Sequence, residues 1–357
     1  MKVVVGLSGG VDSTVTAMLL KEAGHEVIGI TMKIWKEGRY KGGTKDACLS
    51  PRESEDVAKT KLLCESLGIP HYDFDCSDEY EKVVIENFKQ EYLSGNTPNP
   101  CVRCNSFLKF GVLPNLARKS GLEFDKFATG HYARIEQNEA GRYILSVAAD
   151  KTKDQSYFLY RLNQQQLGSL MLPLGNLTKA DVREYARKAE LAVSDKPDSQ
   201  DFYSGDHNEL LETPDREGNI VDLSGKVLGK HKGFWHYTIG QRRGLGIGAG
   251  SPLYVVELNA CRNEVVVGSA TDTIRHKIKI NSCNWVSIEE PQNSLEVSVK
   301  VRSASKPIPA ILKPAGNNIF EIEFPDGVSA AAAGQSAVIY DGDLLLGGGI
   351  ISIPEKD

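Results

Sequence analysis

The chain has 357 residues, of which 41% are hydrophobic and 25% are charged, and its formal net charge is −5. This length is too great for one ordinary core, so two or three domains of a globular protein are expected. No apolar run is long enough to span a bilayer, and the negative net charge excludes bulk attraction to nucleic acid. An RNA partner would therefore need a local basic surface.

The N-terminus and the cysteines favour a cytoplasmic protein without a membrane partner. Residues 1–6 are apolar only briefly before Ser8 and Asp12, which is unlike a secretory signal peptide. An odd number of cysteines in a chain of this size argues against a disulfide framework and favours buried thiols with a few reactive or metal-binding ones. The seven are Cys48, Cys64, Cys76, Cys101, Cys104, Cys261 and Cys283. We expect Cys64 and Cys76 to be packing residues.

Strands and helices alternate along the first part of the chain. Strands are predicted at 2–6, 27–34, 71–75 and 126–130, and helices after Ser13 and at 53–67 and 79–93. This alternation indicates an α/β domain with a parallel sheet covered on both faces. Ligands of such sheets bind beyond the carboxyl ends of the strands. The loops that hold Ser8, Cys48 and Gly130 all follow strands, so we expect them to share one crevice.

The character of the chain changes after about residue 205. The stretch 225–250 is rich in glycine and basic residues, and apolar and polar residues alternate at 296–302, 320–324 and 337–340. The pairs Asp326–Gly327 and Asp341–Gly342 are expected to be turns between these runs. This pattern predicts a small all-β barrel.

A six-residue glycine loop, Ser8-Gly-Gly-Val-Asp-Ser13, follows the first strand and opens a helix. Glycines let the backbone approach a phosphate, and the backbone N–H groups at a helix start, with the Ser8 and Ser13 hydroxyls, supply donors. Asp12 is a candidate for positioning Mg²⁺. An ordinary strand-to-helix turn is the alternative. The string is not a Walker A loop, because it lacks the Gly-Lys-Ser/Thr ending.

A Cys-x-x-Cys pair, Cys101 and Cys104, follows the two prolines of Thr97-Pro-Asn-Pro100. Such a pair can chelate a metal or cluster, act as a redox couple, or offer one thiolate of lowered pKa, and inert loop thiols are the remaining alternative. We expect Arg103 and the start of a helix over 105–110 to favour the thiolate.

A basic stretch without any acidic residue runs from Ser224 to Val256. Its basic residues are Lys226, Lys230, Lys232, Arg242 and Arg243, and Trp235, His236 and Tyr237 lie among them. Cations bind phosphates, and unstacked bases stack on aromatic rings. Beside a nucleotide-activating domain, an RNA-binding face is the better interpretation, and a solvated charged hairpin is the alternative.

Together these segments resemble the bacterial tRNA-specific 2-thiouridylases, a family of N-type ATP pyrophosphatases, along nearly the whole chain. The matching motifs are Gly6 to Ser13, Thr97 to Pro100, Cys104-Asn105, Lys109-Phe110, Ala128 to Tyr132, Lys153 to Leu159, His236 to Arg242, Gly244 to Gly248, Gly334 to Ala337 and Asp341-Gly342. The resemblance implies a catalytic domain over 1–205, a small central domain over 206–270 and a tRNA-binding C-terminal β-barrel over 271–357.

The resemblance also implies residue roles and a reaction. ATP would contact Gly6, Leu7, Ser8, Gly9, Gly10, Val11, Asp12, Ser13, Met32 and Gly130, and tRNA would contact Asn99, Pro100, Cys101, His131, Lys153, Asp154, Gln155, Arg302, Ser303 and Gln335. The wobble uridine at position 34 would attack ATP through O2, and sulfur presented by Cys104 would replace that oxygen at C2 with release of AMP. Either a sulfur-donor protein or free sulfide would be the source of sulfur.

One departure from the family concerns its usual second catalytic cysteine. That cysteine follows a segment like Lys196-Pro-Asp-Ser-Gln-Asp201, and here Tyr203 is at the nearest equivalent position. Two hypotheses fill the gap. In one, Cys101 resolves a Cys104 persulfide as a disulfide. In the other, which we favour, Cys48, Cys101 and Cys104 bind an iron–sulfur cluster of the 4Fe–4S type with one open iron.

The sequence also leaves two rival functions open. An ATP pyrophosphatase that adenylates a small acid, as an amidating ligase does, would share the glycine loop but not need the cysteine pair or the basic stretch. A non-catalytic RNA-binding module would not need an intact loop from Ser8 to Ser13.

Overall fold

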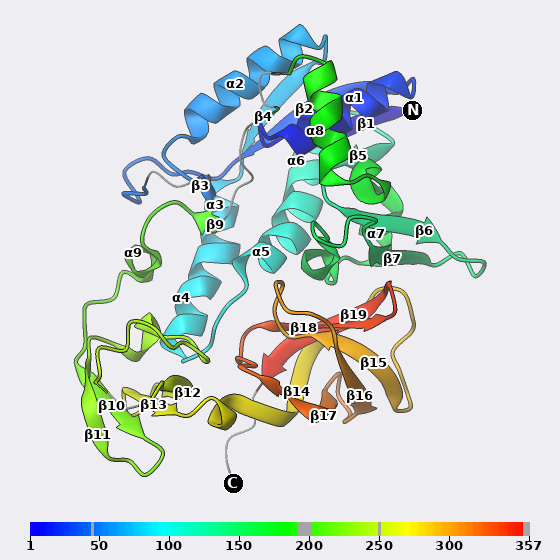
Figure 1. Ribbon diagram of the computed structural model, residues 1–357. Coiled ribbons are helices and arrows are strands. Elements are labelled where there is room, and N and C mark those ends of the chain that lie inside the picture. The colour runs from blue at the N-terminus through cyan, green and yellow to red at the C-terminus, as the bar shows by residue number, and fades with distance from the viewer. Residues whose placement is uncertain (44–45, 192–193, 195–200, 249–250, 353–357) are drawn as a thin grey trace. The chain divides into compact units, whose positions relative to one another are not determined.

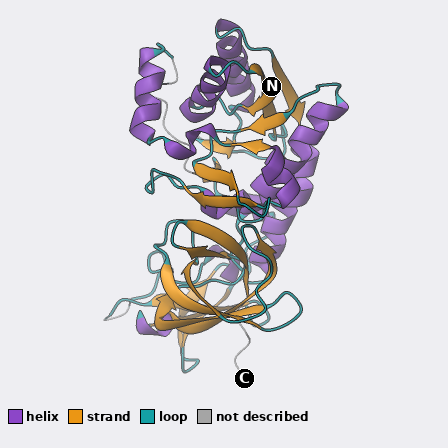
Figure 2. Cartoon of the chain, turned by 90° about the vertical axis from the view of Figure 1, so that its right-hand side faces the viewer, coloured by secondary structure: helices purple, strands orange, loops and turns teal. Residues whose placement is uncertain are grey.

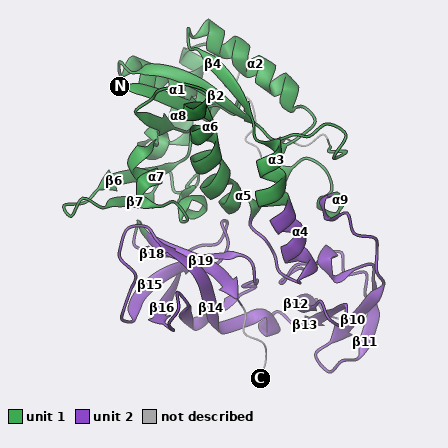
Figure 3. Ribbon diagram, turned by 180° about the vertical axis from the view of Figure 1, so that it is seen from behind, with its two compact units in different colours: residues 1–85, 100–209, 343–345 green, residues 86–99, 210–342, 346–357 purple. Residues whose placement is uncertain are grey.

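In a computed structural model of the protein, residues 1–43, 46–191, 194, 201–248 and 251–352 are described. The chain divides into two compact units, coloured green and purple in Figure 3. Unit 1 contains residues 1–85, 100–209 and 343–345, and unit 2 contains residues 86–99, 210–342 and those from 346 onward. The division into three domains at residues 205 and 270 stays a prediction.

A five-stranded parallel sheet forms the centre of unit 1 (Figure 1). Its order is β4 (His71–Asp75), β2 (Glu26–Lys33), β1 (Lys2–Gly6), β5 (Lys126–Ala128) and β8 (Leu170–Met171). Val3, Val4 and Val5 are all 0% exposed, so both faces of β1 are covered, as a central parallel strand requires. The predicted α/β class with a covered parallel sheet is confirmed.

Helices and short strands complete unit 1. Val3 and Val5 pack with Ala17 of α1 and with Cys64 of α2, so the prediction that Cys64 is a packing residue is confirmed. The helices that lie at least partly in this unit are α1 (Val11–Glu22), α2 (Glu53–Ser66), α3 (Ser77–Tyr80), η1 (Glu81–Ile85), α5 (Pro100–Arg103), η2 (Cys104–Val112), α6 (Leu113–Lys119), η3 (Ser156–Leu159), α7 (Gln164–Ser169), η4 (Pro173–Asn176), α8 (Lys179–Lys188) and α9 (His207–Leu211). The remaining strands are the pair β3 (Ala47–Leu49) and β9 (Asp201–Tyr203) and the hairpin β6 (Ala133–Gln137) and β7 (Tyr143–Val147).

Unit 2 is mainly β-structure (Figure 2). One four-stranded sheet has the order β11 (Val227–His231), β10 (Gly218–Asp222), β13 (Glu264–Gly268) and β12 (Tyr254–Asn259). The other strands are β14 (Ile274–Trp285), β15 (Leu295–Lys300), β16 (Ile308–Pro314), β17 (Phe320–Ser329), β18 (Ser336–Asp341) and β19 (Leu344–Ser352). Because β14 pairs with both β17 and β19, these strands close on themselves, and the predicted C-terminal barrel is confirmed. Helix α4 (Glu86–Leu93) and the 3₁₀ turns η5 (Phe234–His236) and η6 (Thr271–Thr273) also belong to this unit.

The helix expected over 79–93 is confirmed as a continuous helical run of α3, the π-helical segment η1 and α4, and Val84 and Ile85 of η1 are both 0% exposed. One local prediction is wrong. Asp326–Gly327 is not a turn between strands but lies inside β17. Gly327 has a φ of +75°, and the register with β14 shifts between Arg275 and Lys277, so this pair forms an irregularity within a continuous strand. Within the described helices, none is long and apolar enough to cross a bilayer.

Barrel closure generates a stability prediction. Ile280 of β14 is 0% exposed and is paired with Phe320 of β17 and Ile351 of β19. Ile280→Ala should lower the free energy of unfolding by about 2–5 kcal/mol, because it leaves a cavity where the barrel closes. Ile274→Ala, in the same strand but at a side chain that is 38% exposed, is the control and should cost less than about 1 kcal/mol. Equal losses in urea unfolding would contradict the assigned closure.

Candidate active site

The predicted strand, loop and helix are present at the start of unit 1. Gly9 has a φ of +68°, a conformation that glycine adopts without strain. The backbone N–H of Ser8 donates to Ser13 Oγ at 3.2 Å, and the Ser13 hydroxyl donates to the Gly10 carbonyl at 3.2 Å. Gly10 precedes α1 without a side-chain cap, so the first N–H groups of the helix are donors that an anion can use. The loop therefore has the geometry of an anion site.

The carboxyl end of β5 meets this loop. A Cβ atom added to Gly130 would come within 2.8 Å of the Asp12 carbonyl carbon and the Ser13 nitrogen, so Gly130 touches the first turn of α1. On the other side of β1, Met32 is half-buried near the carboxyl end of β2. A separate cavity of about 520 Å³, lined in part by Lys2, Lys21 and His25, lies at the amino ends of β1 and β2, away from the glycine loop. The glycine loop and Gly130 are thus brought together as the sequence predicts.

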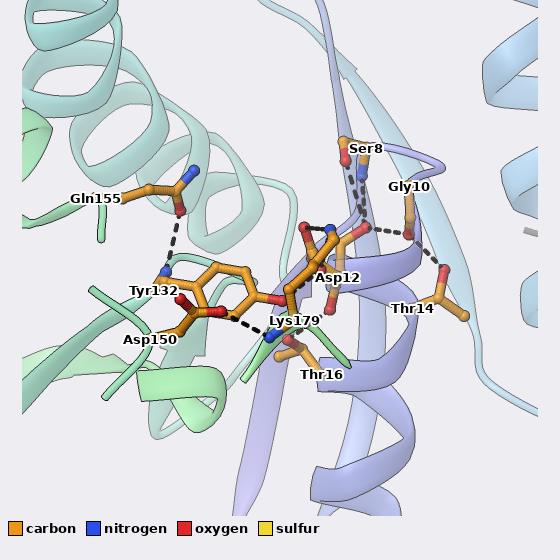
Figure 4. Close-up of polar contacts among 10 residues, drawn as sticks. Ser8, Gly10, Asp12, Thr14, Thr16, Tyr132, Asp150, Gln155 and Lys179 are labelled. Carbon is orange, nitrogen blue, oxygen red and sulfur yellow. Dashed lines mark hydrogen bonds and ion pairs between the residues drawn. The ribbon is translucent and has the colours of Figure 1, made fainter. Parts of the chain in front are cut away.

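Asp12 has two partners that sequence reasoning missed (Figure 4). Lys179 Nζ lies 2.8 Å from Asp12 Oδ1 and 2.7 Å from Oδ2, and the Tyr132 hydroxyl donates to Oδ1 at 2.8 Å. Lys179 is only 8% exposed. The Thr178–Asp181 capping box marks the start of α8 in the sequence, but nothing local indicates that its first residue reaches a carboxylate 167 positions away.

The cysteine pair lies on a helical segment of unit 1 and is protonated. Burial raises the pKa of Cys101 to about 12 and that of Cys104, which is 8% exposed, to about 11. The prediction that Arg103 favours a thiolate is wrong. Arg103 Nε donates to the Val83 carbonyl at 3.0 Å, and the guanidinium lies over the Phe107 ring. Burial raises both pKa values because a thiolate loses favourable interactions with water, so the neutral thiol is favoured.

Lys109 is the cation that acts on these thiols. Burial lowers its pKa, but the negative forms of Cys104, Cys48 and Cys101 more than offset this, so the net pKa is raised. In return the Lys109 charge lowers the pKa of both Cys101 and Cys104 against the larger effect of burial. Lys109 was visible in the sequence only as part of a matching motif, without a role of its own.

The hypothesis of an iron–sulfur cluster is not supported by this arrangement. Cys48 is exposed in β3, Cys101 is half-buried in α5, and Cys104 begins η2. Within the described residues, which include all three cysteines, no group of three or more His, Cys, Asp or Glu side chains is placed to hold a metal ion. Three thiolates around one cluster would require such a group.

The segment in which the family usually has its second catalytic cysteine is described only in part, because residues 196–200 lie outside the described residues. Asp201–Tyr203 form β9, which pairs in parallel with β3, so that Ala47 is opposite Asp201 and Leu49 opposite Tyr203. Tyr203 is 0% exposed, and its hydroxyl donates to Glu209 at 2.6 Å and accepts from the Gly42 N–H at 3.0 Å. Tyr203 is a packing residue with a raised pKa, caused chiefly by burial, and it is not a substitute nucleophile.

Several residues of unit 1 that are predicted to contact RNA form hydrogen bonds within the protein. Asp154 accepts from the Ala148 and Ser156 N–H groups, each at 3.2 Å, and Gln155 accepts from the Tyr132 N–H at 3.0 Å. His131 hydrogen-bonds Thr129 at 2.8 Å, and burial together with the Lys109 charge lowers its pKa to about 3, so it is neutral. Lys153 and Pro100 are half-buried. RNA contact by these residues stays a prediction.

In unit 2, two residues that are predicted to contact RNA donate hydrogen bonds to backbone carbonyls. Arg302 Nη2 donates to the Ile239 carbonyl at 2.8 Å and to the Ala330 carbonyl at 2.9 Å. Gln335 Nε2 donates to the Thr97 carbonyl at 3.0 Å and to the Pro98 carbonyl at 2.8 Å, just before Asn99. Ser303 is exposed, and Asn99 is half-buried. The amide of Gln335 therefore fixes the segment that leads to Pro100 and Cys101.

The aromatic residues of the basic stretch are not a stacking surface. Trp235 is 5% and Tyr237 is 9% exposed, because they belong to the core of unit 2. Lys230 pairs with Glu217 at 3.2 Å, and Lys232 is 3.8 Å from Asp215, so acids from the preceding segment balance part of the charge. The exposed basic residues are Lys226, Lys230, Lys232, Arg242 and Arg243. Any contact with RNA here rests on charge rather than on stacking.

The fold and the loop define an α/β protein with an anion-binding turn at the first strand and a closed β-barrel at the other end of the chain. Three family models match it in succession, described as tRNA methyl transferase HUP domain (residues 1–203), tRNA methyl transferase PRC-barrel domain (210–269) and aminomethyltransferase beta-barrel domain (275–351). A solved 4-thiouridine synthetase–RNA complex with bound ATP has a TM-score of 0.35, with 15% identity over 60% of this chain and 46% of that chain.

Full-length relatives identify the family. The chain is 48% identical to a tRNA-specific 2-thiouridylase MnmA of Endomicrobium trichonymphae, over 98% of this chain and 99% of the relative. It is 44% identical to the protein of the same name from Gloeothece citriformis, again over 98% and 99%, and 43% identical to that of Geotalea uraniireducens, over 98% and 94%. The chain belongs to the tRNA-specific 2-thiouridylase family. The descriptions of the family models mention methyltransferases, whereas the full-length relatives are named as thiouridylases.

The contact of Gly130 with α1 generates a binding prediction. Gly130→Ala should weaken the affinity for ATP, the predicted ligand of the loop, by about tenfold or more, because the new methyl group would displace the first turn of α1. Gly248→Ala is the control, since a Cβ there meets no atom within 4 Å. Calorimetric titration with ATP provides the measurement, and an unchanged affinity of the Gly130 variant would show that the contact does not shape the site.

The neutral state of His131 generates a pH prediction. Its pKa is about 3 in the folded protein, against the ordinary histidine value of 6.5, so the unfolded chain takes up the proton first as the pH falls. Stability is therefore present above about pH 6.5 and is lost towards pH 3, at about 1.4 kcal/mol per pH unit. His131→Gln cannot titrate and should lose about 2 kcal/mol less than the parent between pH 6.5 and 5. Parallel pH profiles of urea unfolding for the two proteins would contradict the assignment.

Proposed function

We propose that the protein thiolates the wobble uridine of tRNA at C2 in an ATP-dependent reaction. The observation that carries the proposal is the presence, in one compact unit, of an anion-binding loop and of a cysteine pair, with Cys104 buried and Cys101 half-buried, whose thiols feel the charge of the half-buried Lys109. The near full-length identity to proteins named tRNA-specific 2-thiouridylase supports the choice of tRNA as substrate and of sulfur as the transferred group.

The first half-reaction activates the base. The loop from Gly6 to Ser13 binds the phosphates of ATP, and Met32 and Gly130 border the nucleotide. O2 of the uridine attacks the α-phosphorus, the bond from that phosphorus to the bridging oxygen breaks, and pyrophosphate leaves. Asp12 is suited to hold Mg²⁺, which neutralises phosphate charge when bound, because a magnesium ion needs only one or two carboxylates alongside substrate phosphates. Backbone donors of α1 stabilise the developing charge.

The second half-reaction transfers sulfur through Cys104. A donor-protein persulfide exchanges with the Cys104 thiol, which becomes a persulfide while the donor becomes a thiol. The terminal sulfur attacks C2 and AMP leaves. The Cys101 thiolate then attacks Cys104 Sγ, forming the Cys101–Cys104 disulfide and releasing the sulfur on C2 as 2-thiouridine. A cellular thiol reductant restores the pair. Lys109 supplies positive charge to the attacking sulfur in surroundings that otherwise disfavour a negative group.

RNA recognition is assigned to the remaining predicted residues. The base has to leave its stack to reach the loop and the cysteines, as enzymes that modify bases require. Asn99 and Pro100 lead directly to Cys101 and border the target base, with Gln335 holding that segment. Lys153, Asp154, Gln155, His131, Arg302 and Ser303 line the path of the RNA or fix the backbone that does so.

Separating the two half-reactions tests the proposal. With tRNA, ATP, Mg²⁺ and a persulfide donor, the wild-type chain should form AMP, pyrophosphate and 2-thiouridine, detected by nucleoside mass spectrometry. Cys104→Ser should retain pyrophosphate release but lose more than about 99% of the 2-thiouridine, because only the sulfur carrier is removed. Cys101→Ser should accumulate a tRNA–protein adduct that thiol reductants cleave. The matched control is Cys261→Ser, at an exposed thiol of unit 2.

The remaining outcomes decide between this function and its rivals. Wild-type protein prepared with and without reconstituted iron should give equal product, and Cys48→Ser should be active. Product only with iron, lost in Cys48→Ser, would overturn the persulfide route and restore the cluster. Pyrophosphate exchange with a small acid and without tRNA would indicate an amidating ligase, and RNA binding without any affinity for ATP would indicate a non-catalytic module.

A further inference from the structure

An ion pair ties the glycine loop to a helix far along the chain. Lys179 Nζ contacts both carboxylate oxygens of Asp12 at 2.7 and 2.8 Å, and its side chain is 10% exposed against 27% for that of Asp12. Removing an ammonium group from water is costly unless it is paired, so a mostly buried lysine at this place needs a reason. Neither of the two proposed half-reactions uses it.

The position of Lys179 is fixed by its surroundings. Thr178 and Asp181 form a capping box at the start of α8, and the Lys179 N–H donates to Asp150 Oδ2 at 3.0 Å. Val182 of α8 packs in one buried cluster with Val11 and Val15 of α1. The ammonium group also lies 5.8 Å from the centre of the Tyr132 ring (Figure 4). The lysine is therefore held against the loop by the packing of α8 on α1.

The loop itself contributes no cation. No lysine or arginine occurs from Gly6 to Ser13, whereas phosphate loops of the Walker type carry a lysine that reaches the terminal phosphates. A polyphosphate in the Ser8–Ser13 loop would meet neutral donors and the Asp12 carboxylate. The nearby positive charge comes from α8, at a side chain whose ammonium group is already desolvated and needs little reorganisation.

We propose that Lys179 is a catalytic residue that contacts the phosphates of the nucleotide and that Asp12 holds it in place until the nucleotide binds. On binding, the ammonium group exchanges one Asp12 oxygen for an oxygen of the departing pyrophosphate, and Asp12 becomes accessible to Mg²⁺. The charge that develops on the leaving group is then met by a preset cation. This inference rests on the proposed function, because it assigns a residue to the same phosphate site.

Equilibrium binding of three probes distinguishes this role from a structural one. The probes are ATP, inorganic pyrophosphate and adenosine, titrated without Mg²⁺. Lys179→Met should bind ATP and pyrophosphate at least tenfold more weakly and adenosine within twofold of the wild type, because only the phosphate contact is lost. Lys179→Arg should retain part of the affinity. The matched control is Lys188→Met on the same helix, at an exposed side chain paired with Glu184.

Asp12 provides the second arm of the test. Asp12→Asn should strengthen Mg²⁺-free binding of pyrophosphate severalfold, because the ammonium group is released and one negative charge is removed. In the double variant Asp12→Asn/Lys179→Met the part of this gain that comes from Lys179 should disappear, which a double-mutant cycle measures. A loss of adenosine affinity equal to that of ATP in Lys179→Met, or unchanged pyrophosphate affinity, would overturn the proposal.

A functional readout separates failure of this inference from failure of the proposed function. Wild-type protein that releases no AMP with tRNA would overturn the proposed function, whatever the binding data. Wild-type protein that releases AMP, with Lys179→Met releasing it at the same rate and binding pyrophosphate normally, would overturn the role of Lys179 alone.

Discussion

The parallel register of β1 and β5 is the constraint on which the site depends. Val3 lies opposite Lys126 and Val5 opposite Ala128, so both strands end at the same edge of the sheet. The turn after β1 becomes the glycine loop, and the turn after β5 brings Gly130 against the first turn of α1. A side chain larger than hydrogen at Gly130 does not fit this contact. The apolar run of β1, buried on both faces, thus determines where the phosphate donors lie.

Burial favours the neutral form of each carboxyl or thiol side chain in the site, and a lysine near each of them favours the negative form. Asp12 is balanced by Lys179, while Cys101 and Cys104 are raised in pKa by burial and lowered again in part by Lys109. The same lysine charge helps to keep His131 neutral. A protonated resting thiol suits a sulfur carrier that becomes nucleophilic only after it is loaded, since a hydropersulfide is a stronger acid than the thiol from which it forms.

Local patterns in the sequence were sufficient for the regular elements and for the loop. The valine run of β1, the apolar residues of α1 and the glycine loop between β1 and α1 are all encoded by neighbouring residues, and the resemblance to a known family added the expectation of a three-part architecture. The alternating runs of β15, β17 and β18 likewise predicted the barrel.

Features that depend on distant residues could not be predicted in this way. The contact of Lys179 with Asp12 joins two helices 167 positions apart, and no local pattern marks it. Arg103 was expected to act on its cysteine neighbours, but the helix directs its side chain to Val83 and Phe107. Trp235 and Tyr237 were expected to face RNA because they lie among basic residues, whereas burial of their large apolar surface places them in the core of unit 2.

If ATP activates the uridine at O2 before sulfur arrives at C2, that oxygen leaves the base on AMP, and its fate can be followed with an isotope. A tRNA carrying oxygen-18 at O2 of the wobble uridine would be thiolated in a single turnover, and the AMP analysed by mass spectrometry. Adenylation of the base predicts that the AMP contains one labelled oxygen for each 2-thiouridine formed. Unlabelled AMP together with labelled water would contradict adenylation of the base and require a different activation step.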